Sequence, residues 1–139
     1  MTERVFVDTN VLIYAHDLDA GLKHDRAVSI LSDLWEKESG IISVQVLQEF
    51  YVNVTRKIST PMTPASARGV IKNYLAWHVA PNDASTVLLA SEIGERNQLS
   101  FWDALIIASA SFAGADRILS EDLNHGQIIE GITIENPFR

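Results

Sequence analysis

The chain has 139 residues, of which 47% are hydrophobic and 21% are charged, and its formal net charge is −7. These values are typical of a soluble globular protein, and the length is that of one domain, which we expect to span residues 1–139. No apolar stretch approaches the roughly 18 residues of a membrane span, and the first residues do not resemble a signal peptide, so we expect a cytoplasmic protein without a membrane partner. The chain has no cysteine, which excludes disulfides and thiolate zinc sites.

Short apolar runs alternate with helical patterns along the chain. In chain order we predict a strand at 4–7, a helix at 11–15, a helix at about 23–38, a strand at 41–42, a helix from 44 to about 58, a helix from 63 or 64 to about 77, a strand around 79, a helix that includes 87–93, a helix at 101–112, and strands at 117–120 and 132–134. Ser43 and Ser100 are expected to cap the helices that follow them. Gly40 and Gly114 are expected to end the helices that precede them.

Strands that alternate with helices are typical of an α/β domain with a mainly parallel central sheet, flanked by helices in an α/β/α arrangement. In such sheets, ligands bind beyond the carboxyl ends of the strands. Polar side chains that directly follow the predicted strands are therefore the first candidates for a functional site.

Four acidic residues stand beside apolar runs, where an isolated charge is costly. Asp8 and Asp122 each follow a predicted strand. Asp103 opens an almost wholly apolar helix, and Glu49 lies among the apolar residues of an earlier helix. Because these carboxylates are spread over the whole chain and each lies near a core segment, they suggest convergence on a metal ion.

Each acidic residue also has a purely structural interpretation. Asp8 is placed to cap the helix that follows it, and Asp122 lies in a turn-like segment. The spacing from Ser100 to Asp103 is that of a capping box, in which the Asp103 carboxylate accepts the Ser100 amide, although such a position does not exclude metal binding. Glu49 lies outside the centre of the apolar stripe of its helix, which favours a side chain in water. Taken singly, the structural interpretations are at least as strong as the functional ones.

Taken jointly, four carboxylates form the all-oxygen ligand set of a hard divalent cation such as Mg²⁺ or Mn²⁺. The four histidines show no metal-binding spacing and are assigned to the surface or the core: His16, His24, His78 and His125. One or two hard cations can polarise a phosphodiester and generate hydroxide. The sequence has neither a glycine-rich phosphate loop nor a Gly-x-Ser-x-Gly motif.

The negative net charge argues against a nucleic-acid partner, but the charges are unevenly distributed. Residues 50–82 contain no Asp or Glu, while they include Arg56, Lys57, Arg68 and Lys72. This segment could face phosphates even though the chain as a whole is acidic. Scattered surface basic residues explain the same pattern equally well.

Four segments of the chain resemble, in order, the sequence blocks of the PIN-domain ribonuclease family. They are residues 5–13 with Asp8, residues 43–50 with Glu49, residues 101–110 with Asp103, and residues 118–123 with Asp122. The third block, Phe-Trp-Asp-Ala-Leu-Ile-Ile-Ala-Ser-Ala, is the most specific, and the likeness covers the whole chain. Within this family, the short chain most resembles the VapC-like toxins of toxin–antitoxin pairs.

The resemblance implies an endoribonuclease that depends on Mg²⁺ or Mn²⁺, is usually a homodimer, and is inhibited by a small VapB-like antitoxin. By position, Asp8 and Asp103 would be the main metal ligands, and Glu49 would complete the cluster or bind through water. Asp122 would bind a second ion or orient a water, although the adjacent Glu121 could compete for this role.

Other residues are expected to support these ligands or to contact RNA. Ser120 matches the family's hydroxyl position beside the last acidic residue, while Thr9 and Asn10 are placed to hydrogen-bond Asp8. The basic residues of the segment 50–82 would contact RNA or the antitoxin. Single-stranded or looped RNA is favoured over duplex, because sequence-specific readers mostly use splayed bases.

Two aromatic residues, Tyr74 and Trp77, could stack on RNA bases. Aromatic residues at such positions more often belong to the core, which is favoured here by about two to one.

Three alternatives remain open at this stage. A phosphoacceptor with Asp8 as nucleophile would need a second aspartate two residues later, where the chain has Asn10. A degenerate PIN-like module that only binds a partner is disfavoured because all four acidic positions are filled. A PIN nuclease of RNA processing or turnover, without a toxin role, would share the proposed chemistry.

Overall fold

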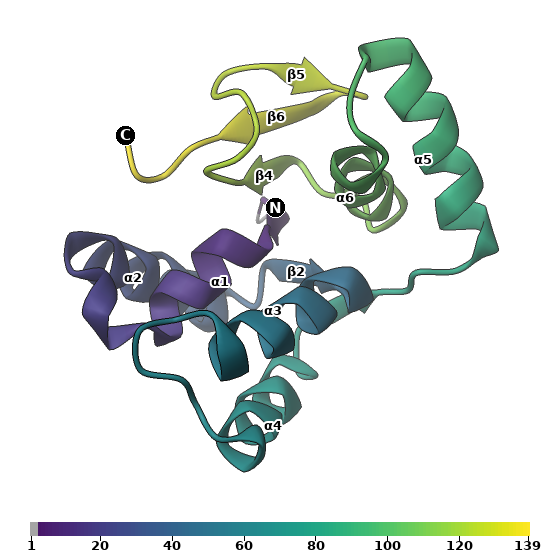
Figure 1. Cartoon of the computed structure of the whole chain (residues 1–139). Coiled ribbons are helices and arrows are strands. Elements are labelled where there is room, and N and C mark those ends of the chain that lie inside the picture. Colours follow the sequence, from purple (N-terminus) through teal and green to yellow (C-terminus); the bar gives the residue numbers. More distant parts are fainter. Residues whose placement is uncertain (1–2) are drawn as a thin grey trace.

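The computed structural model describes residues 3–139, and within this range a six-stranded sheet carries helices on both faces (Figure 1). In chain order the elements are β1 (Val5–Val7), α1 (Thr9–His16), the 3₁₀ turn η1 (Leu18–Ala20), α2 (Leu22–Lys37), β2 (Gly40–Ser43), α3 (Val44–Arg56), α4 (Pro64–Tyr74), β3 (His78–Ala80), α5 (Ala84–Asn97), α6 (Phe101–Phe112), β4 (Arg117–Leu119), β5 (Ile128–Ile129) and β6 (Ile132–Glu135). None of the helices in the described range combines the length and the apolarity that crossing a bilayer requires.

The sheet has the strand order β3-β2-β1-β4-β6-β5. The first five strands in this order are parallel to their neighbours, and β5 alone pairs antiparallel, at the edge. The expected α/β fold with a mainly parallel sheet is therefore confirmed. Parallel strands are usually buried on both faces, and every residue of β1 and β2 is buried here.

The strand order reverses direction beside β1. The connections through α1–α2 and α3–α4 step from β1 to β2 to β3, whereas the connection through α5–α6 returns to β4 on the other side of β1. When crossovers are right-handed, connections that run in opposite directions across the sheet place their helices on opposite faces of it. Figure 1 shows this arrangement for α1–α4 and for α5–α6. The crevice at such a reversal, outside the carboxyl ends of the strands, is the usual ligand site of an open α/β sheet.

Local capping fixes where the helices around this crevice begin. The Asp8 side chain caps α1, Ser43 Oγ accepts from the amide of Val46 in α3, and Ser100 Oγ accepts from the amide of Asp103 in α6. These serine caps agree with the prediction from sequence. Helices α1 and α3 therefore begin directly after β1 and β2, at the edge of the sheet beside the crevice, whereas α6 follows α5.

The end of α2 differs from the prediction. Glu38, rather than Gly40, caps this helix in the left-handed conformation with φ 54°, and its amide donates to the carbonyls of Leu34 and Trp35. Gly40 instead opens β2, where the Trp77 ring packs so closely that an added Cβ would lie 2.5 Å from it. The glycine is required by close packing and not by a turn.

The helix predicted to run to about residue 77 ends three residues earlier, at Tyr74. Turn hydrogen bonds from the amides of Ala76 and Trp77 to the carbonyls of Asn73 and Tyr74 redirect the chain. Both aromatic side chains are then buried, with Tyr74 4% and Trp77 8% exposed. The core interpretation of these two residues is confirmed, because an exposed ring face is needed to stack on a base.

The strand β5 was not predicted from the sequence. Ile129 and Ile132 pair across a two-residue turn in which Glu130 and Gly131 both have positive φ, 52° and 78°. These values are those of a type I′ hairpin turn, which usually carries Asn-Gly or Asp-Gly rather than Glu-Gly. The burial of Ile129 and Ile132, which are 1% and 3% exposed, therefore stabilises the hairpin more than its turn residues do.

We expect Gly40→Ala to destabilise the protein by about 2 kcal/mol or more, because overpacking must move the buried Trp77 ring or the strand. The matched control is Gly69→Ala in α4, where an added Cβ meets nothing within 4 Å. This control should raise the free energy of unfolding by about 0.5–1 kcal/mol, since alanine is the better helix former. Urea unfolding of both variants measures the effects. Equal stabilities for the two variants would contradict the packing account.

Candidate functional site

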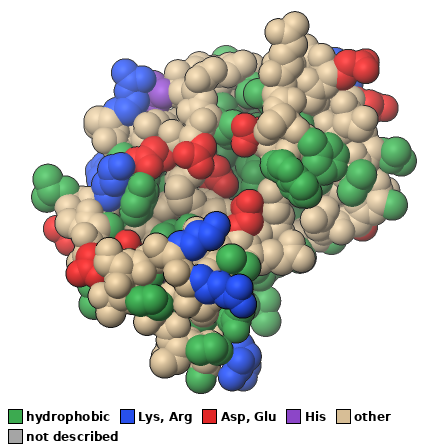
Figure 2. Space-filling model, in the orientation of Figure 1, with side chains coloured by type: hydrophobic (Ala, Val, Ile, Leu, Met, Phe, Trp, Pro, Cys, Tyr) green, Lys and Arg blue, Asp and Glu red, His purple; other side chains and the backbone are tan. Residues whose placement is uncertain are grey.

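The four acidic residues singled out from the sequence line one cavity at the carboxyl ends of β1, β2 and β4. The cavity has a volume of about 300 Å³, and its lining residues are Asp8, Thr9, Asn10, Ile13, Gln45, Glu49, Asn53, Trp102, Asp103, Ile106 and Asp122. Figure 2 shows acidic side chains gathered on this face of the molecule, with hydrophobic side chains beside them. Residues separated by more than 110 positions in the chain are thus brought to one place by the strand order.

Asp8 lies deepest in the cavity and is 8% exposed. Its Oδ1 accepts the backbone amide of Thr9 at 2.7 Å, and its Oδ2 accepts the hydroxyl of Ser120 at 2.7 Å. Asn10 Nδ2 approaches the same Oδ2 at 3.4 Å. These donors are all neutral, so the carboxylate is oriented without a compensating charge.

Asp122 is tied to Asp8 through two shared neighbours. Asn10 Nδ2 donates to Asp122 Oδ2 at 3.2 Å, and Ser120 Oγ accepts the amide of Asp122 at 3.1 Å. Asn10 Oδ1 in turn accepts the amide of Glu121 at 3.1 Å. The turn after β4 is therefore fixed against the start of α1, with Asp122 directed into the cavity.

Glu121, which could compete with Asp122 by sequence, has a different environment. Its carboxylate accepts the Tyr14 hydroxyl at 2.6 Å and forms an ion pair with Lys23 Nζ at 2.6 Å. It does not line the cavity. Asp122 is the acidic residue of this turn that the structure brings to the site.

Glu49 and Asp103 complete the acidic lining from α3 and α6. Glu49 is exposed, as its position outside the apolar stripe suggests, and its Oε1 accepts the Thr9 hydroxyl at 2.7 Å. Thr9 thus binds Asp8 through its amide and Glu49 through its side chain. Asp103 is half-buried and, within the described residues, forms no return hydrogen bond to Ser100, so the predicted capping box is only half made.

The charges of the cavity are of one sign. Within residues 3–139, none of the four carboxylates forms an ion pair with a lysine, arginine or histidine. Burial raises the pKa of Asp8 from 3.8 to about 6; the hydrogen bonds from Ser120 and Thr9 oppose this rise, and the nearby Asp122 and Glu49 carboxylates add to it. The site therefore has an unfavourable electrostatic energy that a cation would relieve.

The donor set fits a hydrated hard cation. Apart from the Trp102 indole, the polar side chains that line the cavity are carboxylates, amides and one hydroxyl, and the buried Gln45 Oε1 has no hydrogen-bond partner among the described residues. Because Gln45 Nε2 donates to the Trp102 carbonyl, the free atom must be the acceptor, which a water bound to the ion could satisfy. Among the described residues, however, no three acidic or histidine side chains are arranged to hold an ion directly.

The basic residues predicted to contact RNA lie on neighbouring helices. The side chains of Arg56, Lys57, Arg68 and Lys72 are all exposed at the end of α3 and on α4. Figure 2 shows lysine and arginine side chains over these helices, on the face that also carries the acidic groups. The structure does not bring them into the cavity itself.

Five residues that line the cavity were not identified from the sequence, namely Ile13, Gln45, Asn53, Trp102 and Ile106. Trp102 lines it beside Asp103, and its side chain is 66% exposed. A large aromatic residue in the first turn of an apolar helix, next to a candidate metal ligand, is a signal that could have indicated it. Sequence analysis considered Tyr74 and Trp77 instead, which are buried.

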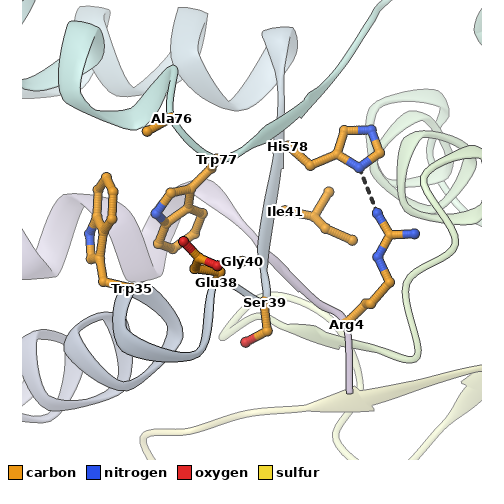
Figure 3. Close-up of a pocket in the computed structure, with 9 residues that line it drawn as sticks. All are labelled: Arg4, Trp35, Glu38, Ser39, Gly40, Ile41, Ala76, Trp77 and His78. Atoms are coloured by element: carbon orange, nitrogen blue, oxygen red, sulfur yellow. Dashed lines mark hydrogen bonds between the residues drawn. The ribbon is translucent and has the colours of Figure 1, made fainter. Parts of the chain in front are cut away.

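A second cavity, of about 210 Å³, lies at the opposite end of the strands. Its walls include Trp35 and Trp77, whose rings meet nearly edge to face at 5.4 Å, and Gly40 at the start of β2. Arg4 Nη2 donates to His78 Nδ1 at 2.6 Å on its far side (Figure 3). Among the described residues that line this cavity, Glu38 alone is acidic, and the cavity lies away from the ends of the strands where Asp8 and Asp122 meet.

Comparison with known proteins identifies a family and a set of related folds. A family model described as PIN domain matches residues 5–129. The crystal structure of Mycobacterium tuberculosis VapC20, a sarcin-ricin loop cleaving toxin, is 21% identical over 85% of this chain and 89% of that chain, with a TM-score of 0.64. No curated protein matches the chain.

Two further solved structures cover almost the whole chain. A toxin–antitoxin complex from Klebsiella pneumoniae is 17% identical over 96% of this chain and 97% of that chain, with a TM-score of 0.69. A DNA-bound VapBC from Salmonella typhimurium is 19% identical over 98% and 99%, with a TM-score of 0.66. At these identities the likeness shows a shared fold.

The burial of Asp8 predicts a pH-dependent stability. In the unfolded chain this carboxyl ionises near its ordinary pKa of 3.8, whereas in the folded protein it keeps its proton up to about pH 6. Between these values the folded state binds more protons, so stability falls as pH rises, and the full loss of roughly 3 kcal/mol is reached above the folded pKa. Asp8→Asn lacks this loss.

We therefore expect the stability difference between Asp8→Asn and the parent protein, measured by urea unfolding in EDTA, to grow in favour of Asp8→Asn from about pH 4 to about pH 7. Added Mg²⁺ should reduce the difference at neutral pH, because it should bind the protein that keeps the Asp8 carboxylate more tightly than Asp8→Asn. A difference that stays constant with pH would show that Asp8 is not the buried, uncompensated charge described above.

Proposed function

Because the chain belongs to the PIN-domain family, we propose that it is a metal-dependent endoribonuclease whose reaction takes place in the acidic cavity. The observation that carries this proposal is the convergence of Asp8, Glu49, Asp103 and Asp122 on one cavity without a cationic partner among the described residues. A fold that used these side chains only as caps and turn residues would have no reason to collect them. We propose the whole chain, residues 1–139, as the functional domain.

The residues that would hold Mg²⁺ or Mn²⁺ are the four carboxylates, with Asp8 and Asp103 as the main ligands, Glu49 acting directly or through water, and Asp122 placed for a second ion or a water. When bound, the ion supplies a polarised phosphate and a more acidic water. The remaining roles belong to the protein. Ser120 and the Thr9 amide orient the Asp8 carboxylate, and Asn10 sets the distance between Asp8 and Asp122.

RNA binding would extend from the cavity over α3 and α4. Phosphates approaching an acidic cavity are repelled unless cations or basic side chains compensate. Arg56 and Lys57 at the end of α3, with Arg68 and Lys72 on α4, are our proposed backbone contacts. Such contacts carry affinity without sequence preference.

We further propose that the protein is a toxin, that a VapB-like antitoxin binds it, and that it forms a homodimer. This proposal is supported by the solved structures of similar fold, which include a toxin and toxin–antitoxin complexes. We propose the cytoplasm as the site of action, since RNA is the substrate. A PIN nuclease of RNA processing is the alternative within the same chemistry.

Cleavage of a mixed pool of single-stranded RNA tests the nuclease proposal. We expect cleavage with Mg²⁺ or Mn²⁺, none in EDTA, and a loss of about 100-fold or more in Asp8→Asn and Asp103→Asn, because an ion ligand is removed. Ser120→Ala should lose about 10- to 100-fold, since Ser120 is not an ion ligand but orients Asp8 and the turn that carries Asp122. Glu121→Gln is the matched control beside Asp122 and should cleave normally. Cleavage that survives both EDTA and Asp8→Asn would contradict the proposal.

Expression in a bacterial host tests the toxin role. The parent protein should arrest growth, Asp103→Asn should not, and co-expression of the small gene adjacent to its own should restore growth. Normal growth with the active nuclease would contradict the toxin role and favour RNA processing, while the cleavage assay above would still support the chemistry.

A further inference from the structure

We infer that Trp102 is a base-stacking residue of the site, so that the enzyme takes single-stranded RNA with one unstacked base against this indole. The inference rests on the proposed nuclease function and adds to it the residue that holds the nucleotide next to the acidic cavity. Three observations support it: the exposure of Trp102, the packing of its ring on Phe101, and its place in the cavity.

The exposure of Trp102 is unusual for its residue type. Tryptophan is highly buried on average, yet this side chain is 66% exposed, while the other two tryptophans, Trp35 and Trp77, are 38% and 8% exposed. A large apolar surface left in water at a cavity mouth marks a contact with something else. Among the described aromatic residues, Trp102 alone lines the acidic cavity.

The Trp102 ring packs on one aromatic neighbour, and the backbone that carries it is hydrogen-bonded. Phe101 meets the indole edge to face, with ring centroids 5.3 Å apart and planes at 79°. The Trp102 carbonyl accepts the Gln45 amide at 3.4 Å, and Ser100 caps the helix two residues earlier. The indole therefore projects from a fixed backbone, so that ordering it on binding costs little conformational entropy.

The indole and the proposed ion ligands line the same cavity. A base stacked on the indole would therefore place its phosphate toward the acidic residues. A base is neutral and has an apolar face, and it can therefore rest beside carboxylates that would repel a phosphate. Figure 2 shows hydrophobic and acidic side chains on one face of the molecule.

Stacking on an indole requires a base that is not already stacked in a helix. Aromatic platforms of this kind hold single-stranded nucleic acid with little sequence preference, because every base has a π-face. Duplex RNA would have to open before it could use Trp102. The structure thus favours single strands and loops as substrates.

The experiment compares variants in cleavage and in binding. With a short mixed-sequence single-stranded RNA, Trp102→Ala should raise KM about tenfold with little change in kcat, and Trp102→Phe should recover most of the loss, since one base stack is removed and then restored. Phe112→Ala is the matched control, because Phe112 is a 58% exposed aromatic residue on the same helix outside the cavity. It should behave as the parent protein does.

Binding separates stacking from a structural effect. In the Asp8→Asn background, which leaves the RNA intact, a single abasic site is moved along the same RNA. One position should weaken binding about tenfold with Trp102 present, and the same abasic change should have less than about a twofold effect with Trp102→Ala, because the two changes remove one contact.

Independent effects of the abasic site and of Trp102→Ala would overturn the inference. So would a Trp102→Ala protein whose only change is in its oligomeric state, which would assign the ring to a contact with a second copy. If the parent protein cleaves RNA and Trp102→Ala cleaves it equally well, the inference fails while the proposed function stands. If the parent protein neither binds nor cleaves RNA, both fail.

Discussion

The carboxylate of Asp8 lies at the end of a wholly buried strand, held by an amide and a hydroxyl and faced by two further carboxylates. Neutral hydrogen bonds orient such a charge but do not compensate for its removal from water, so its pKa rises to about 6. The rest of the site can be understood from this constraint. A hard cation would reverse the sign of the local field, making favourable the same cluster of oxygens that is otherwise mutually repulsive.

The groups that orient Asp8 also connect the end of β1 to the turn after β4, beside the reversal of strand order. Ser120 and Asn10 each bind both Asp8 and this turn, so the geometry of the cavity depends on one hydrogen-bond network. A change at Ser120 would therefore move the acidic residues relative to one another as well as removing a hydrogen bond. Fold stability and site geometry are coupled here because the reversal of strand order and the site are the same place.

Two tryptophans show how position decides the role of one residue type. Trp77 follows a helix but turns into the core, where its ring packs on Gly40. Trp102 opens a helix at the crevice, and the helix directs its ring outward while the following residues are buried. Both lie at the edges of apolar segments, so composition and spacing alone do not separate them. Only the packing of the neighbouring elements assigns one to the core and the other to the mouth of the cavity.

The sequence by itself determined what depends on neighbours in the chain: the caps of α3 and α6, the bounds of α6, and the alternation that makes a parallel sheet. The four acidic positions were also found this way, because carboxylates beside apolar runs are locally conspicuous. Tertiary structure decided the rest. Whether Asp122 or Glu121 faces the cavity depends on Tyr14 and Lys23, which are about 100 residues away. The hairpin β5–β6 depends on burial against the sheet. Such contacts join segments that no local pattern relates, and so only the folded chain specifies them.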